Sequence, residues 1–466
     1  MVICCGYGAP ISDLNKDIRN KKQLWLGSFG ESGIKNNHDE AGHLMVQLNS
    51  LLVAFLLVFM TSALCRWALI TINIRHLRRY GHHVPEVFKD DIDAEILRKM
   101  TDYTITSSRF GAWETLCDDI LSLVILLSGV LPWLVLVILS WHLHFIFSGL
   151  IFFGLLALLS SVLSIPFSLY STFVIEKRFG FSTMTMKLWM TDFLKGLLIS
   201  AFLMAILLGA FLALMHYAAA TWWLWAWVVF ALFQMLILWL YPVLIAPLFN
   251  KYEPVKDETL KEAIIAMMNR AGLKIKGVFQ VDEGKRTKHT NAYFTGFGKT
   301  KRIVLYDTLL TSHSTDEILS ILAHEIGHWK KKHILKQLVF LEISSLVGFY
   351  IAYRLVDWPL LYRTFGFDQV ISYVGLLLLG ALFGPLSFFL TPFGAMVSRK
   401  FEREADDFAF DITGTTKPLV DALKRLAKDN LANLHPHPFY AWFYYSHPPL
   451  TERIGRLQDL EEKKTT

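Results

Sequence analysis

Long apolar segments dominate the chain and alternate with charged ones. An apolar segment of about 20 residues forms a helix long enough to cross a bilayer, although a single such segment also occurs as a buried core helix. Seven in one chain are typical of a multi-pass membrane protein. The predicted spans are residues 44–73, 116–141, 147–173, 193–217, 221–247, 334–355 and 370–397.

Two connections between the predicted spans are very short. Ser140–His144 separates the second span from the third, and His216–Ala218 separates the fourth from the fifth. Connections of this length predict helical hairpins. We therefore expect an all-α membrane protein with about seven transmembrane helices.

The composition supports this fold class. The chain of 466 residues is 53% hydrophobic, 14% aromatic and only 18% charged, which is too apolar for an ordinary soluble protein. Its net charge of +6 is attributed to basic loops of a membrane protein, so we expect no nucleic-acid partner. Cys4, Cys5, Cys65 and Cys117 are scattered and match neither a zinc knuckle nor a disulfide framework.

The basic residues gather in alternate connections. They follow the first and third spans and fill residues 248–333 and the tail after 397, so these parts are predicted to be cytoplasmic. Residues 1–43 form a polar leader without a signal-peptide pattern, for which disorder is expected. The leader falls on the opposite side yet is also basic, so either it is an exception or the first span is wrongly assigned.

The charged segment 248–333 is predicted to be a small α/β insert. Lys256–Arg270 has the pattern of an amphipathic helix, and three short segments have that of strands: Val278–Val281, Asn291–Phe297 and Ile303–Tyr306. The chain then divides into the leader 1–43, spans one to five in 44–247, the insert 248–333, spans six and seven in 334–397, and C-terminal helices in 398–466.

The insert ends in an H-E-x-x-H motif. Residues four apart share one face of a helix, so His324 and His328 can bind one zinc ion, with Glu325 as a general base. Two solvated histidines on a surface helix are the alternative. Ser314 and Glu317 form a capping-box pattern that opens a helix before the motif, and this context favours the metal site.

A third ligand is expected from the end of the last span. The helix that carries His328 is predicted to enter the bilayer near Ile334, about 9 Å further on at 1.5 Å per residue. The antiparallel last span leaves the bilayer just before Glu402, which can complete a site for one Zn²⁺ per chain. Asp406, on the same face, can hydrogen-bond a ligand histidine, whereas Glu404 faces away. A charged helix end with local ion pairs is the alternative.

Two weaker patterns concern the substrate. Asn291, Ala292 and Tyr293 are predicted in an edge strand that pairs with an extended peptide, although an ordinary structural strand explains them equally well. His447, in Ser446–Pro449, is a candidate for stabilising a tetrahedral oxyanion, although a histidine before prolines is more often a turn residue.

Several ordered motifs together resemble those of the type I CAAX prenyl proteases, which are multi-pass membrane zinc metalloproteases. The resemblance covers about residues 45–456. Besides the zinc motif, it rests on Phe173–Phe181, Ala246–Lys251, Arg286–Gly298, Lys301–Leu309, Phe401–Asp406 and Ser446–Arg453.

The resemblance implies that Glu402 is the third ligand, that His447 and Arg453 line the catalytic site and that Asn291 binds the substrate backbone. It also implies a barrel of seven helices around a water-filled chamber, closed at its cytosolic end by the zinc domain. Members of the family remove C-terminal tripeptides from prenylated proteins, and some clear other membrane-associated proteins. We therefore expect a zinc endopeptidase, monomeric and in contact with membrane lipid, in which Glu325 is the general base.

Three other functions are weighed against this one. A heat-shock type quality-control metalloprotease has the same motif without prenyl specificity, usually in a shorter chain. A site-2-type protease buries its motif in an apolar span, whereas three lysines follow this one. A non-enzymatic chamber that binds lipid or substrate around a structural zinc would not need Glu325. Lys463 and Lys464 match a dilysine signal for the endoplasmic reticulum, whereas a bacterial protein would lie in the inner membrane.

Overall fold

The computed structural model describes residues 46–295 and 302–465, and every structural statement below refers to these residues. The predicted leader 1–43 and the end of the second predicted strand, Gly296–Phe297, lie outside the described residues.

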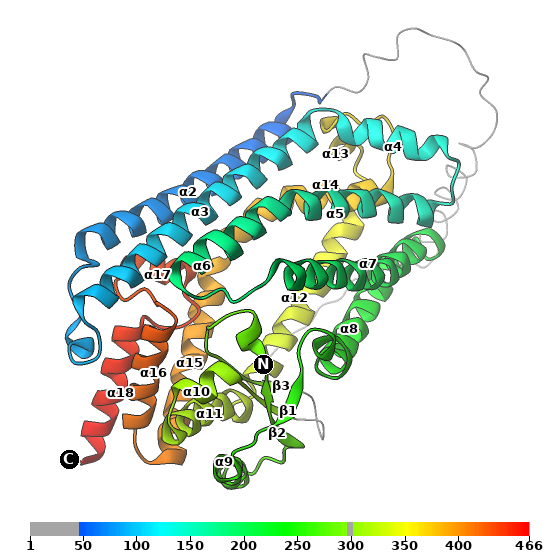
Figure 1. The fold of residues 1–466 in the computed structure, drawn as a ribbon. Helices are drawn as coiled ribbons and strands as arrows, with labels where there is room; N and C mark the ends of the chain where they lie inside the picture. Colours follow the sequence, from blue (N-terminus) through cyan, green and yellow to red (C-terminus); the bar gives the residue numbers. More distant parts are fainter. Residues whose placement is uncertain (1–45, 296–301, 466) are drawn as a thin grey trace, which may run out of the picture. The chain divides into compact units, whose positions relative to one another are not determined.

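In this part of the chain, five helices are long and apolar enough to cross a membrane, and two bent helix pairs bring the number to seven if each pair is one span. The predicted all-α membrane architecture is confirmed (Figure 1). The five are α2 (Ser50–Tyr80), α5 with α6 (Phe145–Tyr170, Glu176–Phe179), α7 (Met186–Tyr217), α8 (Trp222–Leu240) continued to Leu248, and α12 (His333–Leu355). The pairs are α3 (Ala94–Leu127) with α4 (Val130–Ser140), and α14 (Ser372–Phe388) with α15 (Thr391–Thr413).

Both bends have a local cause. The angle between α3 and α4 is 57°, and Gly129 lies at the junction with φ of 80°, a backbone conformation that glycine adopts without steric cost. The angle between α14 and α15 is 56°. Pro392 follows that junction, and in a continuous helix its ring would clash with the carbonyl group of Phe388.

The membrane helices contact one another in a closed order. Contacts run from α2 through α3, α4, α5, α7, α8, α12 and α14 back to α2. A cavity of about 670 Å³ lies among α2, α3, α4, α5 and α14. Its walls are mostly apolar, but they include an ion pair in which Arg66 and Asp119 approach to 2.7 Å.

The insert contains a four-stranded sheet in the order β1-β2-β4-β3. Three of its strands match the predicted ones, while β1, a Tyr-Glu-Pro segment of three residues, has no alternating pattern and was not predicted. β2 and β4 are parallel, and the two edge strands are antiparallel to their neighbours. The strands are β1 (Tyr252–Pro254), β2 (Gly277–Val281), β3 (Ala292–Thr295) and β4 (Arg302–Tyr306).

The remaining helices surround this sheet or connect the larger elements. They are α9 (Glu258–Arg270), α10 (Asp307–Ser312), α11 (Thr315–Lys330), α13 (Pro359–Thr364), α16 (Lys417–Asp429), α17 (Pro438–Tyr444) and α18 (Leu450–Thr465).

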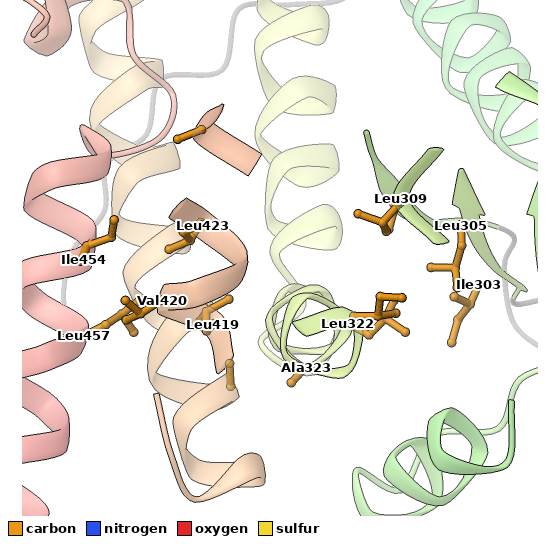
Figure 2. Close-up of a cluster of buried hydrophobic side chains, with 14 of the residues drawn as sticks. Ile303, Leu305, Leu309, Leu322, Ala323, Leu419, Val420, Leu423, Ile454 and Leu457 are labelled. Atoms are coloured by element: carbon orange, nitrogen blue, oxygen red, sulfur yellow. The ribbon is translucent and has the colours of Figure 1, made fainter. Parts of the chain in front are cut away.

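Helix α11 lies at the centre of a buried apolar cluster (Figure 2). The sheet packs on one side of it, and α16 and α18 lie on the other. Each fully buried leucine or isoleucine side chain contributes roughly 1.5–3 kcal/mol to folding, so this cluster fixes the position of α11. The side chains labelled in the figure are Ile303, Leu305, Leu309, Leu322, Ala323, Leu419, Val420, Leu423, Ile454 and Leu457.

The start of α11 matches its prediction and the end does not. Ser314 and Glu317 form the complete capping box. The helix was expected to continue into the membrane span, but it ends at Lys330, and α12 begins at His333. Lys332 between them has φ of 58°, a left-handed conformation that a continuous helix cannot contain.

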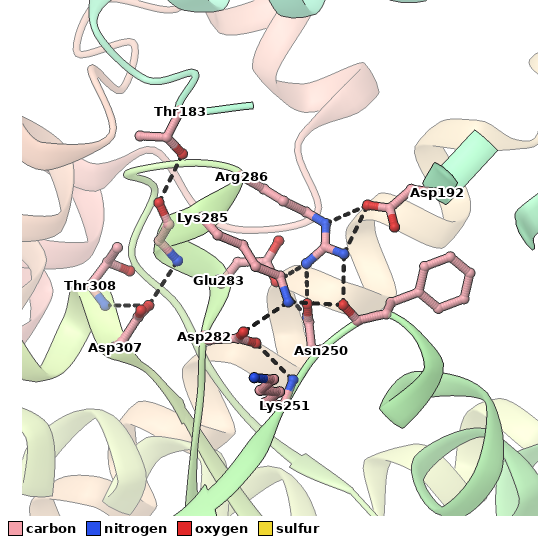
Figure 3. A network of polar contacts seen from close by, with 12 residues as sticks. Thr183, Asp192, Asn250, Lys251, Asp282, Glu283, Lys285, Arg286, Asp307 and Thr308 are labelled. Carbon is pink, nitrogen blue, oxygen red and sulfur yellow. Dashed lines mark hydrogen bonds and ion pairs between the residues drawn. The ribbon is translucent and has the colours of Figure 1, made fainter. Parts of the chain in front are cut away.

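A polar network joins the insert to the membrane helices (Figure 3). Arg286 Nε donates to Asp192 Oδ2 of α7 at 2.8 Å, and Arg286 Nη2 donates to the carbonyl oxygen of Phe249 at 2.8 Å. The same guanidinium also donates to Asn250. The Arg286 and Asp192 side chains are only 12% and 16% exposed. This network therefore holds three separate segments in one arrangement.

We expect Arg286→Ala to destabilise the fold strongly, because it leaves the carboxylate of Asp192 mostly buried without its partner. Breaking a buried ion pair in this way costs roughly 3–5 kcal/mol. Thermal unfolding of the purified protein in detergent measures the effect. Arg98→Ala is the matched control, since Arg98 is 85% exposed in its pair with Asp102. Equal unfolding temperatures for the two variants would contradict a structural role for the network.

Candidate metal centre

Three of the predicted site residues lie together. Nitrogen and oxygen atoms of His324, His328 and Glu402 all lie within 4.8 Å of one another, and no other such group of His, Cys, Asp and Glu occurs among the described residues. The two Nε2 atoms are 3.2 Å apart. Glu402 Oε2 lies 3.4 Å from His324 Nε2, and Glu402 Oε1 lies 3.3 Å from His328 Nε2.

Close packing of α11 on α15 produces this arrangement. The two helices touch at Gly327, where a Cβ atom would lie 2.8 Å from Ala405 Cα and 2.9 Å from the Ala405 carbonyl oxygen. Gly327 lies one residue before His328, and Ala405 lies one helical turn after Glu402. The missing side chain therefore lets the carboxylate reach both imidazoles.

The donor set fits a divalent metal ion. Two imidazoles and one carboxylate are a ligand set of catalytic zinc sites, which leave one position open. Glu402 is 3% exposed, and its Oε2 atom accepts no well-directed hydrogen bond from the described residues. A buried carboxylate whose two oxygens each face a ring nitrogen, one of His324 and one of His328, is suited to bind a cation together with them.

Asp406 and Arg453 lie behind His324. His324 Nδ1 lies 2.8 Å from Asp406 Oδ1, as expected for an outer partner of a ligand histidine. Arg453 Nε donates to Asp406 Oδ2 at 2.9 Å, and Arg453 Nη1 lies 3.6 Å from Glu402 Oε2. Both residues are buried, so the guanidinium balances the charge of two carboxylates inside the protein.

These contacts also affect proton binding. Burial and the charge of Arg453 disfavour the protonated ring of His324, but contacts with Asp406 and Glu402 outweigh them and raise its pKa. Burial likewise opposes the charge of Arg453, yet the attraction of Asp406 raises the pKa of its guanidinium. Arg453 thus remains a permanent cation within the site.

Glu325 and His447 lie at the accessible part of the site. Glu325 is half-buried and makes no hydrogen bond or ion pair with the described residues. His447, between α17 and α18, has a 62% exposed side chain, and its Nδ1 atom lies 2.7 Å from Glu402 Oε2. Both side chains are therefore accessible to a substrate, whereas Arg453 is enclosed.

The predicted substrate strand forms one edge of the sheet. β3 pairs only with β4, with Tyr293 opposite Val304, and it contacts α11. Asn291, just before β3, is exposed, and its Oδ1 atom accepts from the Ala292 N–H at 2.8 Å. Asn291, Ala292 and Tyr293 therefore lie next to the metal-binding helix, with the second edge of β3 free of any described strand.

One neighbour of the site was not predicted. His333 Nδ1 lies 3.0 Å from His328 Nδ1, and His333 Nε2 lies 3.0 Å from Glu404 Oε2. A third histidine close to the motif is the feature of the sequence that could indicate this contact. The helix break at Lys332, which brings His333 to His328, has no evident sequence pattern.

Comparisons with known proteins agree over most of the chain. Two family profiles match, "CAAX prenyl protease N-terminal, five membrane helices" over residues 73–251 and "Peptidase family M48" over residues 254–461. CAAX prenyl protease 1 of Saccharomyces cerevisiae is 35% identical over 408 residues, covering 82% of this chain and 90% of that protein. The Homo sapiens homolog is 31% identical over 444 residues, covering 83% and 91%. The crystal structure of S. mikatae Ste24p superposes with a TM-score of 0.81 at 30% identity, covering 88% of this chain and 99% of that chain.

We expect Gly327→Ala to disrupt the metal centre. The added methyl group would meet backbone atoms of Ala405, which cannot move without separating α11 from α15. Overpacking of this kind costs roughly 1–3 kcal/mol. Elemental analysis should find less bound metal, and the unfolding temperature should fall.

Gly394→Ala on α15 is the matched control, because a Cβ atom there meets nothing within 4 Å. Alanine is also the better helix former by about 1 kcal/mol, so this variant should be at least as stable as the wild type. Full metal content in the Gly327→Ala protein would show that the close contact does not determine the site.

Proposed function

The chain belongs to peptidase family M48, with the N-terminal region of the CAAX prenyl proteases, and from this premise we propose that it is a zinc endopeptidase acting near the C-terminus of prenylated proteins. It is an integral membrane metalloendopeptidase. Our proposal concerns the identity of the metal ion, the roles of the site residues and the class of substrate. The convergence of His324, His328 and Glu402 is the observation that carries it.

We propose one Zn²⁺ per chain, held by these three residues, because their donor atoms match its preferred ligands. When bound, the ion would supply Lewis-acid chemistry, polarising the scissile carbonyl group and making water a better nucleophile at neutral pH. Asp406 fixes the ring of His324, and Arg453 holds Asp406 in place.

Glu325 is the proposed general base. It lies on the same helix as both histidines, and its carboxylate makes no hydrogen bond or ion pair among the described residues. In this role the carboxylate accepts a proton from the attacking water and delivers it to the leaving amine. His447 is proposed to donate a hydrogen bond to the developing oxyanion, and its exposure at the rim supports this. Arg453 acts from behind the site.

The substrate is proposed to bind as an extended peptide along β3. An edge strand offers free backbone donors and acceptors for such a peptide, and β3 contacts α11. Asn291, Ala292 and Tyr293 would supply this surface. A prenylated substrate is supported by the relatives, which are CAAX prenyl proteases, and by the membrane helices beside the insert.

Among the alternatives, membership of a peptidase family excludes the non-enzymatic chamber. The heat-shock type protease is disfavoured because the chain spans 90% of the curated yeast relative. We further propose that the metal centre faces the cytoplasm, since the basic connections lie on its side of the membrane.

We expect Glu325→Gln to retain the metal and lose peptide cleavage by a factor of about 10²–10⁴, because the amide cannot accept the proton. Release of the C-terminal tripeptide from a farnesylated peptide measures turnover, and elemental analysis measures the metal. Glu258→Gln, on the exposed surface of α9, should be fully active. Normal turnover of Glu325→Gln would refute the general-base role.

The proposed substrate class is tested on the wild-type protein. Farnesylated and unmodified copies of one peptide, offered side by side, should be cleaved at clearly different kcat/KM, with the farnesylated copy preferred. The reason is that the prenyl group can bury its apolar surface against the membrane helices, and the unmodified peptide has no such group. Equal kcat/KM for the two copies would contradict prenyl specificity and favour a general quality-control role.

A further inference from the structure

A second set of contacts lies behind the metal centre, on the side of His328. His333 is 1% exposed, and its two ring nitrogens each lie 3.0 Å from a polar atom, His328 Nδ1 on one side and Glu404 Oε2 on the other. The ring also stacks on Phe401, with centroids 4.1 Å apart and an angle of 9° between the planes. His333 is thus fixed on three sides.

The positions of the hydrogen atoms on His328 and His333 follow from which ring nitrogens can donate and which can accept. A neutral imidazole that binds a metal through Nε2 carries its hydrogen on Nδ1. His328 Nδ1–H must then donate to His333 Nδ1, which makes His333 the acceptor and leaves its hydrogen on Nε2. His333 Nε2–H in turn donates to the carboxylate of Glu404. With the hydrogens placed in this way, both hydrogen bonds run in one direction, from His328 through His333 to Glu404.

We propose that His333 and Glu404 are positioning residues that hold His328 as a metal ligand. His324 is oriented directly by Asp406, and His328 is oriented through an intervening histidine. Hydrogen bonds from outer partners fix the tautomer and the rotation of a ligand ring, and their loss typically weakens metal binding. The inference rests on the proposed metal site and adds two residues to it.

The chain is folded specifically to make this contact. On a continuous helix, residue 333 would lie about 140° around the axis from His328, at 3.6 residues per turn. The break at Lys332, with φ of 58°, instead turns the first residue of α12 toward His328. A lysine in this conformation costs roughly 1–2 kcal/mol relative to a helical one, so the fold maintains the break against a local preference.

Glu404 is itself held by other contacts. Lys336 Nζ lies 3.8 Å and Lys400 Nζ lies 4.0 Å from its carboxylate, which is 29% exposed. These two lysines and His333 surround the carboxylate of Glu404 and keep it in place as an acceptor. If Glu404 only formed surface ion pairs, its contacts with the two lysines would be enough. Glu404 also accepts a hydrogen bond from the buried ring of His333.

The test uses the full-length protein in detergent, stripped of metal and titrated with Co²⁺. His333→Phe keeps an aromatic ring for stacking on Phe401 and removes both ring nitrogens. We expect it to weaken Co²⁺ binding by about 10- to 100-fold and to change the Co²⁺ absorption spectrum. The unfolding temperature of the metal-free protein should stay close to that of the wild type.

Two further variants separate positioning from packing. Glu404→Ala removes the acceptor and should weaken Co²⁺ binding, whereas Glu404→Gln keeps a carbonyl oxygen there and should recover most of the affinity. His313→Phe is the matched control, because His313 is also buried, at 7% exposure, but lies before α11 and away from the metal ligands. It should bind Co²⁺ as the wild type does.

The outcomes distinguish the inference from the proposed function. Wild-type affinity and spectrum in His333→Phe, or equal losses in His333→Phe and His313→Phe, would overturn the positioning role while leaving the metal site intact. A wild-type protein that binds no Co²⁺ would overturn the metal site itself.

Discussion

The contact between the backbones of α11 and α15 is the constraint on which the site depends. Gly327 presents no side chain to Ala405, so the two helices approach more closely than any larger residue allows. Ala323 and Ala405 are completely buried along the same contact. Only this approach brings a carboxylate from one helix between two imidazoles of the other. The apolar cluster around α11 then holds the contact in place.

The second requirement is to keep charged groups buried. Glu402 and Asp406 are 3% and 1% exposed, and taking an unpaired carboxylate out of water costs several kcal/mol. Arg453 lies within reach of both, and it comes from α18, the last helix of the chain. Helix α18 packs on α16, which packs on α11. Helices α16 and α18 are therefore part of the candidate metal centre, although neither carries a proposed metal ligand.

Much of this could be predicted from local patterns. The capping box places the motif on a helix, and helical spacing places Asp406 on the face of Glu402. The apolar segments predict the spans but hide their bends, because hydropathy averages over the single residues that cause them. Pro392 is one such residue. The contact at Gly327 joins distant segments, and no local pattern contains it.

The feature that is hardest to predict is the helix break at Lys332, which links the insert to the membrane helices. Three lysines after the motif were interpreted as a membrane interface on a continuous helix, but they contain the break at Lys332. Because of this break, α11 packs with the sheet while α12 takes its place in the closed order of membrane helices.

A matching change of direction at Phe389–Leu390 separates α14 from α15, which carries Glu402. Both helices that carry the proposed metal ligands thus begin or end beside a membrane span, where the chain changes direction. The proposed hydrolysis of a lipid-modified peptide needs water at the scissile bond and apolar surroundings for the lipid. The candidate metal centre lies between two such junctions and meets both needs, since its polar side chains can bind water and its connections lead to the membrane helices.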